Sequence, residues 1–293
     1  MPKLRIGDLE VEKPIIQGGM GVGISMSGLA SAVANKGGIG VISSVGMGMM
    51  IPGRGKKARE DNRNLLIEEI RKAKNMSGGI IGVNIMVALT DYDDMVKLSL
   101  DENVDILFLG AGLPLRFSKD ISLTQLRETR TKFVPIVSSA RAAHIIFKFW
   151  QKNFNRIPDG VVVEGPLAGG HLGFKKEQIY DLDFALEKIV PDVLITIHQY
   201  EERFGREIPV IAAGGIYTGE DIHKFLELGV QGVQMATRFV ATYECDASDE
   251  FKQSYIRCKK EDITIIDSPV GLPGRAIRNR FLDEVSAGAR KPF

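Results

Sequence analysis

Cysteine is scarce in this chain: Cys245 and Cys258 are the only two among 293 residues. These two residues make neither a disulfide framework nor a zinc-ligand pattern, both of which need more cysteines or histidines at regular spacing. We therefore expect a protein of a reducing, cytoplasmic compartment.

An excess of charge and long apolar segments are missing as well. The formal net charge is +1, so there is no basic excess to displace counterions from nucleic-acid phosphates. No apolar run approaches the roughly 18 residues that span a bilayer, and residues 1–13 contain no signal-peptide core. The sequence predicts a protein that acts on a small molecule, with no nucleic-acid or membrane partner; a homodimer is left open.

The dinucleotide fingerprint G-x-G-x-x-G is also absent, because Gly21 and Gly23 are followed by Met26 at the position of the third glycine. Instead, eight short apolar runs alternate with amphipathic stretches such as 25–37 and 218–229. Continuous apolar strands are typical of a parallel sheet that is covered on both faces. Eight such units in about 240 residues favour a closed (β/α)8 TIM barrel over an open doubly wound sheet. The strands are expected to begin at Pro14, Ile39, Ile80, Asp105, Phe133, Gly160, Pro209 and Gly232.

Two segments exceed a minimal barrel. The long loop 44–61 follows the second expected strand, and the tail 245–293 carries helical patterns. We therefore divide the chain into a barrel domain, 1–244, and a C-terminal helical segment, 245–293. This second segment is expected to cap the barrel mouth, and it ends without a clear stop signal.

Glycines, amides and small hydroxyls dominate the carboxyl ends of the expected strands, where (β/α)8 enzymes form their active sites. These ends show no carboxylate pair, Ser-His-Asp set or metal-ligand cluster, so we expect no metal. Such a lining suits a large cofactor held by backbone and amide groups, with one proton-transfer residue. His171, in the run EGPLAGGHLGF (164–174), is the candidate, because imidazole exchanges protons near neutral pH. The alternative is a tight loop with a surface histidine.

A phosphate site is expected after the last two strands. Gly214 and Gly215 follow the seventh strand, and Ala236 and Thr237 follow the eighth. Barrels commonly bind phosphate in these loops through backbone N–H groups and a helix N-terminus. Tight turns without a ligand are the alternative, but both loops show the pattern together.

Five motifs in chain order, PIIQGGM, GVNIM, AGGH, PVIAAGGI and QMATRF, together resemble the nitronate monooxygenase family. The resemblance runs from Pro14 to Asn279, and it implies an FMN-binding TIM barrel with His171 as the catalytic residue. The family also includes flavin-dependent enoyl-acyl carrier protein reductases and NADH:quinone reductases. The flavin-binding residues implied by the resemblance are Gly18, Gly19, Met20, Asn84, Glu164, Gly169, Gly170, Gly214, Gly215, Ala236 and Thr237.

Three residues depart from the family pattern. Leu167 stands where the family usually has Glu, Leu172 stands where nitronate-oxidising members have Arg, and Phe174 fits neither oxidases nor reductases. The preferred reading is a nitronate monooxygenase that uses O2. The alternatives are an enoyl-acyl carrier protein or quinone reductase with NAD(P)H as co-substrate, and a flavin-binding protein without turnover.

The cations of the loop 44–61 bear on the reductase reading. They either receive a nicotinamide phosphate or an acidic carrier protein, or they are simply solvated. These cations are Arg54, Lys56, Lys57 and Arg59.

Overall fold

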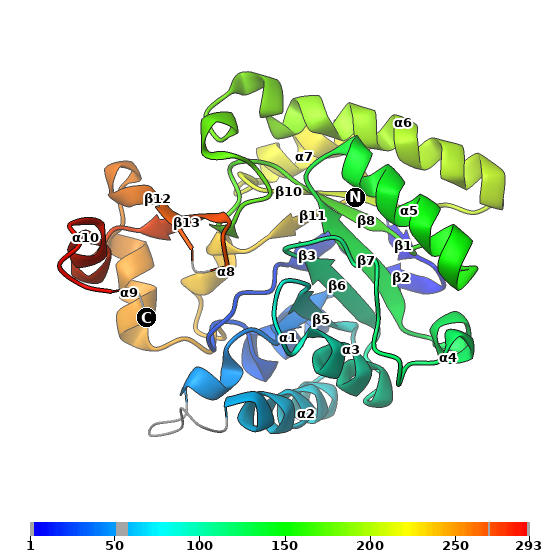
Figure 1. Cartoon of the computed structure of the whole chain (residues 1–293), viewed down its shortest axis with the longest axis horizontal. Helices are drawn as coiled ribbons and strands as arrows, with labels where there is room; N and C mark the ends of the chain where they lie inside the picture. Colours follow the sequence, from blue (N-terminus) through cyan, green and yellow to red (C-terminus); the bar gives the residue numbers. More distant parts are fainter. Residues whose placement is uncertain (1–2, 51–57, 269, 292–293) are drawn as a thin grey trace.

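Eight parallel strands form the centre of the computed structural model, which describes residues 3–50, 58–268 and 270–291. Neighbouring strands follow the order β3-β11-β10-β8-β7-β6-β5-β4, and helices surround them (Figure 1). A parallel bridge between Ile16 and Ile39 joins the two ends of this order. The predicted (β/α)8 fold is therefore confirmed. The strands are β3 (Ile15–Gln17), β4 (Gly40–Ser43), β5 (Ile81–Met86), β6 (Ile106–Gly110), β7 (Lys132–Val137), β8 (Val161–Glu164), β10 (Val210–Ala213) and β11 (Gly232–Met235).

Gln17 links β3 to β4, two strands whose pairing is limited to the bridge between Ile16 and Ile39. Its fully buried side chain accepts a hydrogen bond from the Val41 N–H at 2.9 Å and donates one to the Gly18 oxygen at 2.6 Å. Its main-chain N–H donates to the Ile39 oxygen at 3.0 Å. A buried amide side chain needs hydrogen-bonding partners. The bonds of Gln17 provide these partners and at the same time link β3 to β4, which closes the barrel.

An antiparallel hairpin of β1 (Leu4–Ile6) and β2 (Leu9–Val11) plugs the amino-terminal end of the barrel. Leu4 lies against Gly232, and Gly7 lies against Lys132, at the starts of β11 and β7. Since one end is plugged, a ligand can approach the barrel axis only at the carboxyl ends of the strands. The buried cluster inside the barrel includes Leu4, Ile6, Val11, Phe108, Val162 and Ile211.

Each connection between successive barrel strands contains an α-helix. The expected helix at 218–229 is present as α7, where Thr218 Oγ1 accepts from the Asp221 N–H at 3.1 Å and the Asp221 carboxylate accepts from the Thr218 N–H at 2.8 Å. This reciprocal capping box satisfies two helix-end donors. The helices are α1 (Ser27–Asn35), α2 (Ala58–Met76), α3 (Tyr92–Asp101), α4 (Leu123–Glu128), α5 (Ala140–Phe154), α6 (Leu186–Phe204) and α7 (Gly219–Glu227), with 3-10 turns η2 (Lys176–Gln178) and η3 (Leu182–Phe184).

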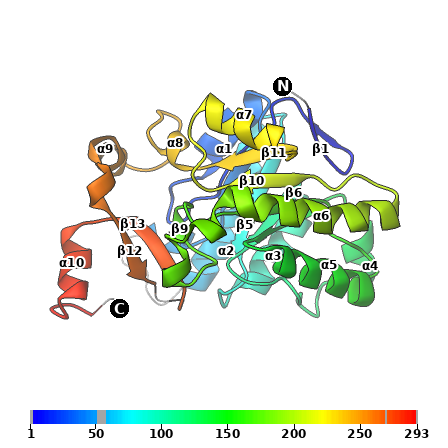
Figure 2. The same cartoon turned by 90° about the horizontal axis from the view of Figure 1, so that it is seen from above.

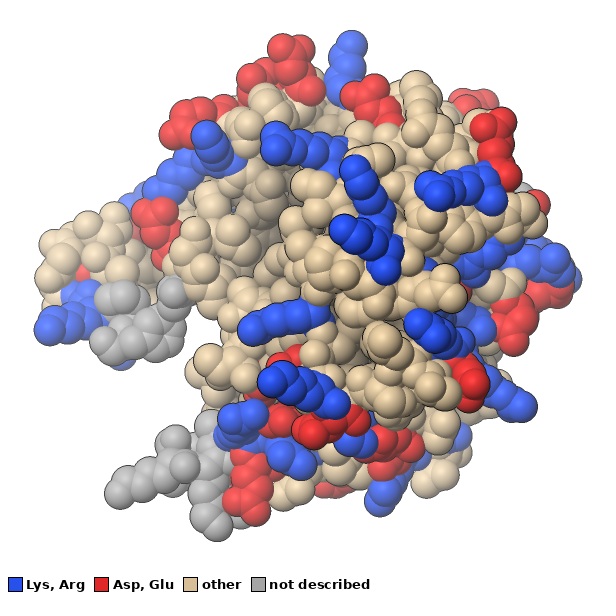
Figure 3. Space-filling model, turned by 45° about the vertical axis from the view of Figure 1, so that its right-hand side comes forward, with Lys and Arg blue, Asp and Glu red and all other residues tan. Residues whose placement is uncertain are grey.

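The described surface carries mixed charge. Over the face in Figure 3, Lys and Arg side chains lie interspersed with Asp and Glu, in keeping with the net charge of +1. Within the described ranges, no helix combines the length and the apolar character needed to cross a membrane.

The segment after β4 is partly helical rather than a continuous loop. The 3-10 turn η1 (Met47–Met50) and the first turn of α2 both fall within the segment 44–61. Arg59 therefore lies on α2, where its Nε donates to Asp94 Oδ2 at 2.7 Å, so this cation is paired within the fold. The other cations expected in this loop fall outside the described residues; they are Arg54, Lys56 and Lys57.

The tail after Cys245 forms an arm on the side of the barrel opposite the β1–β2 plug (Figures 1 and 2). The arm contains the expected helices, α9 (Asp249–Arg257) and α10 (Arg280–Ser286), and a short turn η4 (Lys260–Asp262). The division of the chain at 244/245 stays a prediction.

The arm also contains a hairpin that the helical patterns did not predict. β12 (Ile263–Asp267) pairs antiparallel with β13 (Pro273–Ile277), and β13 pairs with the two-residue strand β9 (Gly170–His171). The pairing partner of β13 lies in the loop after β8, far away in the sequence. Local sequence patterns cannot reveal a strand whose pairing depends on such a distant segment.

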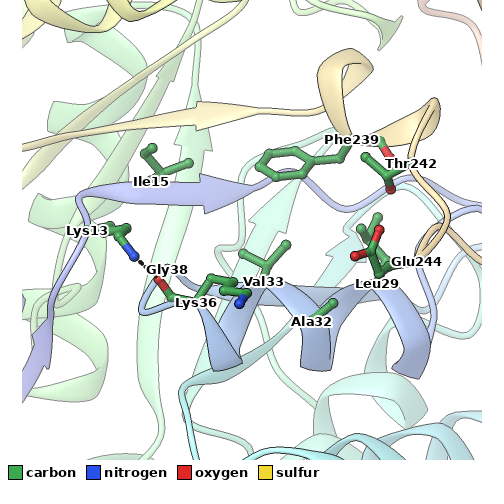
Figure 4. A pocket seen from close by; sticks show the side chains of 10 residues that line it. All are labelled: Lys13, Ile15, Leu29, Ala32, Val33, Lys36, Gly38, Phe239, Thr242 and Glu244. Carbon is green, nitrogen blue, oxygen red and sulfur yellow. Dashed lines mark hydrogen bonds between the residues drawn. The ribbon is translucent and has the colours of Figure 1, made fainter.

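The eighth helix of the barrel is the single turn α8 (Thr237–Val240), after which the chain leaves for the arm. An apolar hollow of about 230 Å³ lies beside it, and Figure 4 shows the side chains of Ile15, Val33 and Phe239 around this hollow. The hollow lies on the outer wall between β3 and α1. It is therefore separate from the strand ends where the site residues are expected.

Candidate active site

Polar side chains that face the barrel axis form a layer at the carboxyl ends of the strands. On β8, Val161 and Val163 pack outward against the helices, and Val162 packs inside the barrel. Because side chains alternate along a strand, Glu164 faces the axis one layer beyond Val162. The same alternation turns three more polar residues inward: Asn84, Ser138 and Gln234.

Asn84 fits closely against the loop that follows β3. A Cβ atom on Gly19 would overlap the Asn84 side chain, so only glycine allows this approach. The main-chain oxygen of Asn84 accepts hydrogen bonds from the N–H and the Oγ of Ser44, each at 3.1 Å. In the same loop, the Met20 N–H donates to Ser25 Oγ at 2.8 Å. The structure thus brings Gly19 and Asn84 into contact, with Met20 beside them.

Glu164 is a partly buried carboxyl group with no ion pair or hydrogen-bonding partner for its side chain within the described part of the chain. Burial disfavours its charged form and raises the pKa of Glu164 to about 7. The carboxyl group therefore changes its protonation state near neutral pH, where it can donate or accept a hydrogen bond on the barrel axis.

His171 lies on β9, whose backbone is held by β13. The imidazole is half-buried, and this burial lowers the pKa of His171 below its ordinary value. The ring is therefore neutral at neutral pH and available to accept a proton.

The glycines before His171 leave open space. A Cβ atom on Gly169 or Gly170 would meet no other atom within 4 Å, and Gly170 has a φ of +71°. After His171, by contrast, Leu172 and Phe174 are buried in the core. The departures from the family pattern at Leu172 and Phe174 are thus core residues that anchor the loop, and neither presents a polar group to the site.

The loops after β10 and β11 lie side by side because these two strands pair in parallel. Gly214 and Gly215 have φ values of +96° and +80°, which glycine adopts without strain. Gly18 lies beside the loop after β11, since a Cβ atom on Gly18 would lie 3.3 Å from the Cβ of Ala236. Within the described chain, the N–H groups of Gly214, Gly215, Ala236 and Thr237 donate to no acceptor, so they are available to an anion.

The amino terminus of α1, by contrast, is already satisfied by carboxylates. Asp246 accepts from the N–H groups of Met26 at 2.8 Å and Leu29 at 3.0 Å, and Glu69 accepts from the Ser27 N–H at 2.7 Å. These negative charges exclude a second anion there. The available N–H groups after β10 and β11 therefore form the better phosphate site.

Three residues of this region have no role assigned from the sequence. Gln234 and Ser138 stand at expected strand ends, and the alternation along their strands turns them toward the axis. Arg275 of β13 donates from Nε to the Ala168 oxygen at 3.0 Å and from Nη2 to the Pro166 oxygen at 2.8 Å. No local signal identifies Arg275, because its partners lie more than a hundred residues away.

Gly169 and Gly170 form an open surface, here called the glycine shelf. This shelf, the inward polar layer and the available N–H groups together suit a planar cofactor that carries a phosphate. The residues present thus fit the FMN that the sequence resemblance implies. The individual roles of the predicted site residues stay predictions.

Comparison with known proteins identifies a matching family. The profile described as nitronate monooxygenase matches residues 3–97 and 62–292. A probable nitronate monooxygenase of Staphylococcus aureus is 25% identical over 303 residues, covering 95% of this chain and 79% of that protein. A (3aS,4S,5R,7aS)-5-hydroxy-7a-methyl-1-oxo-octahydro-1H-indene-4-carboxyl-CoA dehydrogenase of Mycobacterium tuberculosis is 27% identical over 280 residues, covering 96% of this chain and 67% of that protein.

Solved structures share the fold. FabK from Thermotoga maritima superposes with a TM-score of 0.71 and 29% identity, covering 94% of this chain and 75% of that one. A nitroalkane oxidase from Streptomyces ansochromogenes superposes with a TM-score of 0.70 and 22% identity, covering 94% and 79%, and it supports the fold alone.

Proposed function

The chain belongs to the nitronate monooxygenase family, and we propose that it is an FMN-dependent oxidoreductase that oxidises alkyl nitronates with O2. The observation that carries this proposal is the site itself. A half-buried neutral imidazole stands next to the open glycine shelf, and a carboxyl group with a pKa of about 7 faces the barrel axis. Oxidoreductase activity is also named for relatives that span most of the chain.

Different groups of this chain are placed to bind different parts of the cofactor. The N–H groups of Gly214, Gly215, Ala236 and Thr237 would hold the phosphate, and the small residues of this surface would let it approach the backbone. The open space at Gly169 and Gly170 would leave room for the isoalloxazine ring. The inward-facing Asn84, Glu164 and Gln234 would supply hydrogen bonds to the ring or its ribityl chain. Bound FMN supplies the electron acceptor of the reaction.

His171 accepts the substrate's proton and stabilises the anionic form of the substrate. Its neutral ring accepts the α-proton of a nitroalkane, and the resulting imidazolium stabilises the nitronate oxygens. For a substrate that is already a nitronate, only this second role is needed. The buried Leu172 and Phe174 keep the histidine loop in place and exclude water on its core side.

An NAD(P)H-dependent reductase of an enoyl thioester or a quinone is a second candidate. The observation in its favour is the 27% identity over 96% of this chain to a relative named as a carboxyl-CoA dehydrogenase. In that case His171 supplies a proton to, or positions the carbonyl of, the thioester. Leu172 also lacks the guanidinium that nitronate-oxidising members carry.

One experiment separates these functions. The purified protein is mixed anaerobically with propyl nitronate, NADH or NADPH, and the flavin absorbance is followed. Rapid bleaching by the nitronate supports the oxidase, and rapid bleaching by a nicotinamide supports the reductase.

Chromatography of the acid-released cofactor should show FMN; stoichiometric FAD, or no flavin after gentle purification, contradicts the proposal.

A further inference from the structure

The hairpin β12–β13 contacts the histidine loop through β13. Gly274 lies opposite His171, and Arg275 lies opposite Gly170 in the antiparallel register. The Leu172 N–H donates to the Pro273 oxygen at 2.8 Å. The arm therefore supplies a backbone partner to the loop on which the proposed catalytic residue lies.

The side chain of Arg275 adds a second connection to the same loop. Its Nε and Nη2 donate to the oxygens of Ala168 and Pro166, at 3.0 and 2.8 Å. These two oxygens belong to a turn that is closed by the Ala168 N–H donating to the Gly165 oxygen at 3.1 Å. Leu167, between them, is 62% exposed, so its own side chain does not anchor the turn in the core. Pro166 and Ala168 are themselves buried, and the guanidinium fork holds their main-chain oxygens.

Arg275 and His171 lie on opposite faces of the β9–β13 ladder. Gly274, not Arg275, is the cross-strand neighbour of His171, and side chains alternate along each strand. Leu172, on the same face as Arg275, is fully buried in the core. The imidazole therefore projects from the other face, next to a residue without a side chain, and Arg275 does not compete for the same space.

We propose that Arg275 is the positioning residue of the His171 loop, which it holds by donating two hydrogen bonds from one guanidinium group. This inference rests on the proposed role of His171. Without the fork, the oxygens of Pro166 and Ala168 lose their donors and the loop 165–172 opens more often. Lysine cannot replace it fully, because an ammonium group does not present two donors in a fixed plane.

The test uses the full chain with its bound flavin and compares Arg275→Ala and Arg275→Lys with wild type. Arg278→Ala is the matched control, since Arg278 lies just beyond β13 and its Nε donates to Asp283 within the arm. Amide hydrogen exchange is followed in peptides that cover residues 165–173. A two-dimensional NMR titration follows the imidazole pKa of His171, which His171→Asn assigns among the four histidines.

We expect exchange in 165–173 to accelerate about tenfold or more in Arg275→Ala, because two charge-assisted hydrogen bonds are lost. Arg275→Lys should give an intermediate acceleration, and Arg278→Ala should match wild type. The pKa of His171 should rise in Arg275→Ala as the ring becomes more exposed, and kcat should fall more than flavin affinity. Unchanged exchange in Arg275→Ala, or full rescue by lysine, overturns the proposal.

The exchange and NMR measurements need no turnover. If wild type fails to oxidise nitronates, the proposed function is wrong, yet these measurements still decide whether Arg275 holds the loop. Should Arg275→Ala fail to fold, the lysine variant provides the same comparison.

Discussion

At the scale of single residues, burial shifts the pKa values of two titratable groups in opposite directions, and each shift favours the uncharged form. It raises the pKa of Glu164 to about 7 and lowers that of His171. Both shifts follow from the cost of keeping a charge away from water. Near neutral pH the site therefore holds an uncharged imidazole, and a carboxyl group that exchanges its proton readily.

The substitution His171→Ala should lower kcat/KM by about 10²–10⁴-fold with a neutral nitroalkane, because general acid–base catalysis contributes that much. The loss should be smaller with a preformed nitronate, which needs no deprotonation. Flavin content should stay near wild type, since the glycines before His171, and not its imidazole ring, are predicted to contact the cofactor. The exposed His223 provides the control: His223→Ala should leave all three measurements unchanged. Equal rates for wild type and His171→Ala with both substrates contradict the catalytic role.

The substitution Glu164→Gln should remove a pH dependence of stability. The pKa of Glu164 is higher in the folded state than in the unfolded state, so the folded protein binds the proton more tightly. The contribution to stability is present below the unfolded pKa and is lost as pH rises through about 7.

Relative to Glu164→Gln, wild type should lose on the order of 2 kcal/mol of unfolding free energy between pH 5 and pH 8. Urea unfolding of samples matched for flavin content measures this difference. A difference that stays constant over that range shows that Glu164 titrates as an exposed carboxyl group.

At the scale of elements, the ends of neighbouring strands and helices decide where negative charge can bind. The amino terminus of α1 is occupied by Asp246 and Glu69. The loops after β10 and β11 keep their N–H groups available within the described residues, and α8 begins there at Thr237. One helix end is therefore structural, and the other is suited to a phosphate.

The substitution Thr237→Asp should weaken FMN binding at least tenfold, because a carboxylate beside the phosphate adds like-charge repulsion. The Asn side chain has nearly the same shape as Asp but no charge, so Thr237→Asn should bind FMN within about threefold of wild type. An acidic residue at the start of a helix does not destabilise it, so the fold should be retained. Fluorescence titration at two ionic strengths measures the effect; equal affinities of the Asp and Asn variants place the phosphate elsewhere.

At the scale of the whole molecule, the two ends of the barrel have different functions. The β1–β2 hairpin fills the amino-terminal end with buried apolar side chains. The arm approaches the other end and pairs with the loop that carries His171. The apolar packing of the hairpin thus closes one end of the barrel, and the candidate site lies at the other end.

The substitution Leu4→Ala should destabilise the protein by about 2–5 kcal/mol, as expected when a fully buried leucine is removed from a core. Arg5→Ala, on the same strand but exposed, should change stability by less than about 1 kcal/mol, since its ion pair with Glu10 is at the surface. Chemical denaturation measures both changes. Equal stabilities of the two variants contradict the plug role of the hairpin.

Patterns in the sequence predicted the barrel and placed the candidate site at the carboxyl ends of its strands. Eight apolar runs of strand length, each followed by a helical pattern, leave few other folds, because local burial and periodicity are written into neighbouring residues. The strand ends can be read in the same way, and Gly19 and Asn84 both follow or end such strands.

The surroundings of those residues depend on contacts that form in the folded chain. The pKa of Glu164 depends on how many groups exclude water from it, and the sequence does not contain that number. The pairing of β13 with β9 and the contacts of Arg275 join segments that are distant in the sequence; Arg275 and Ala168, for example, are 107 residues apart. Such contacts form only when the folded chain brings both segments to the same end of the barrel, so no local pattern encodes them.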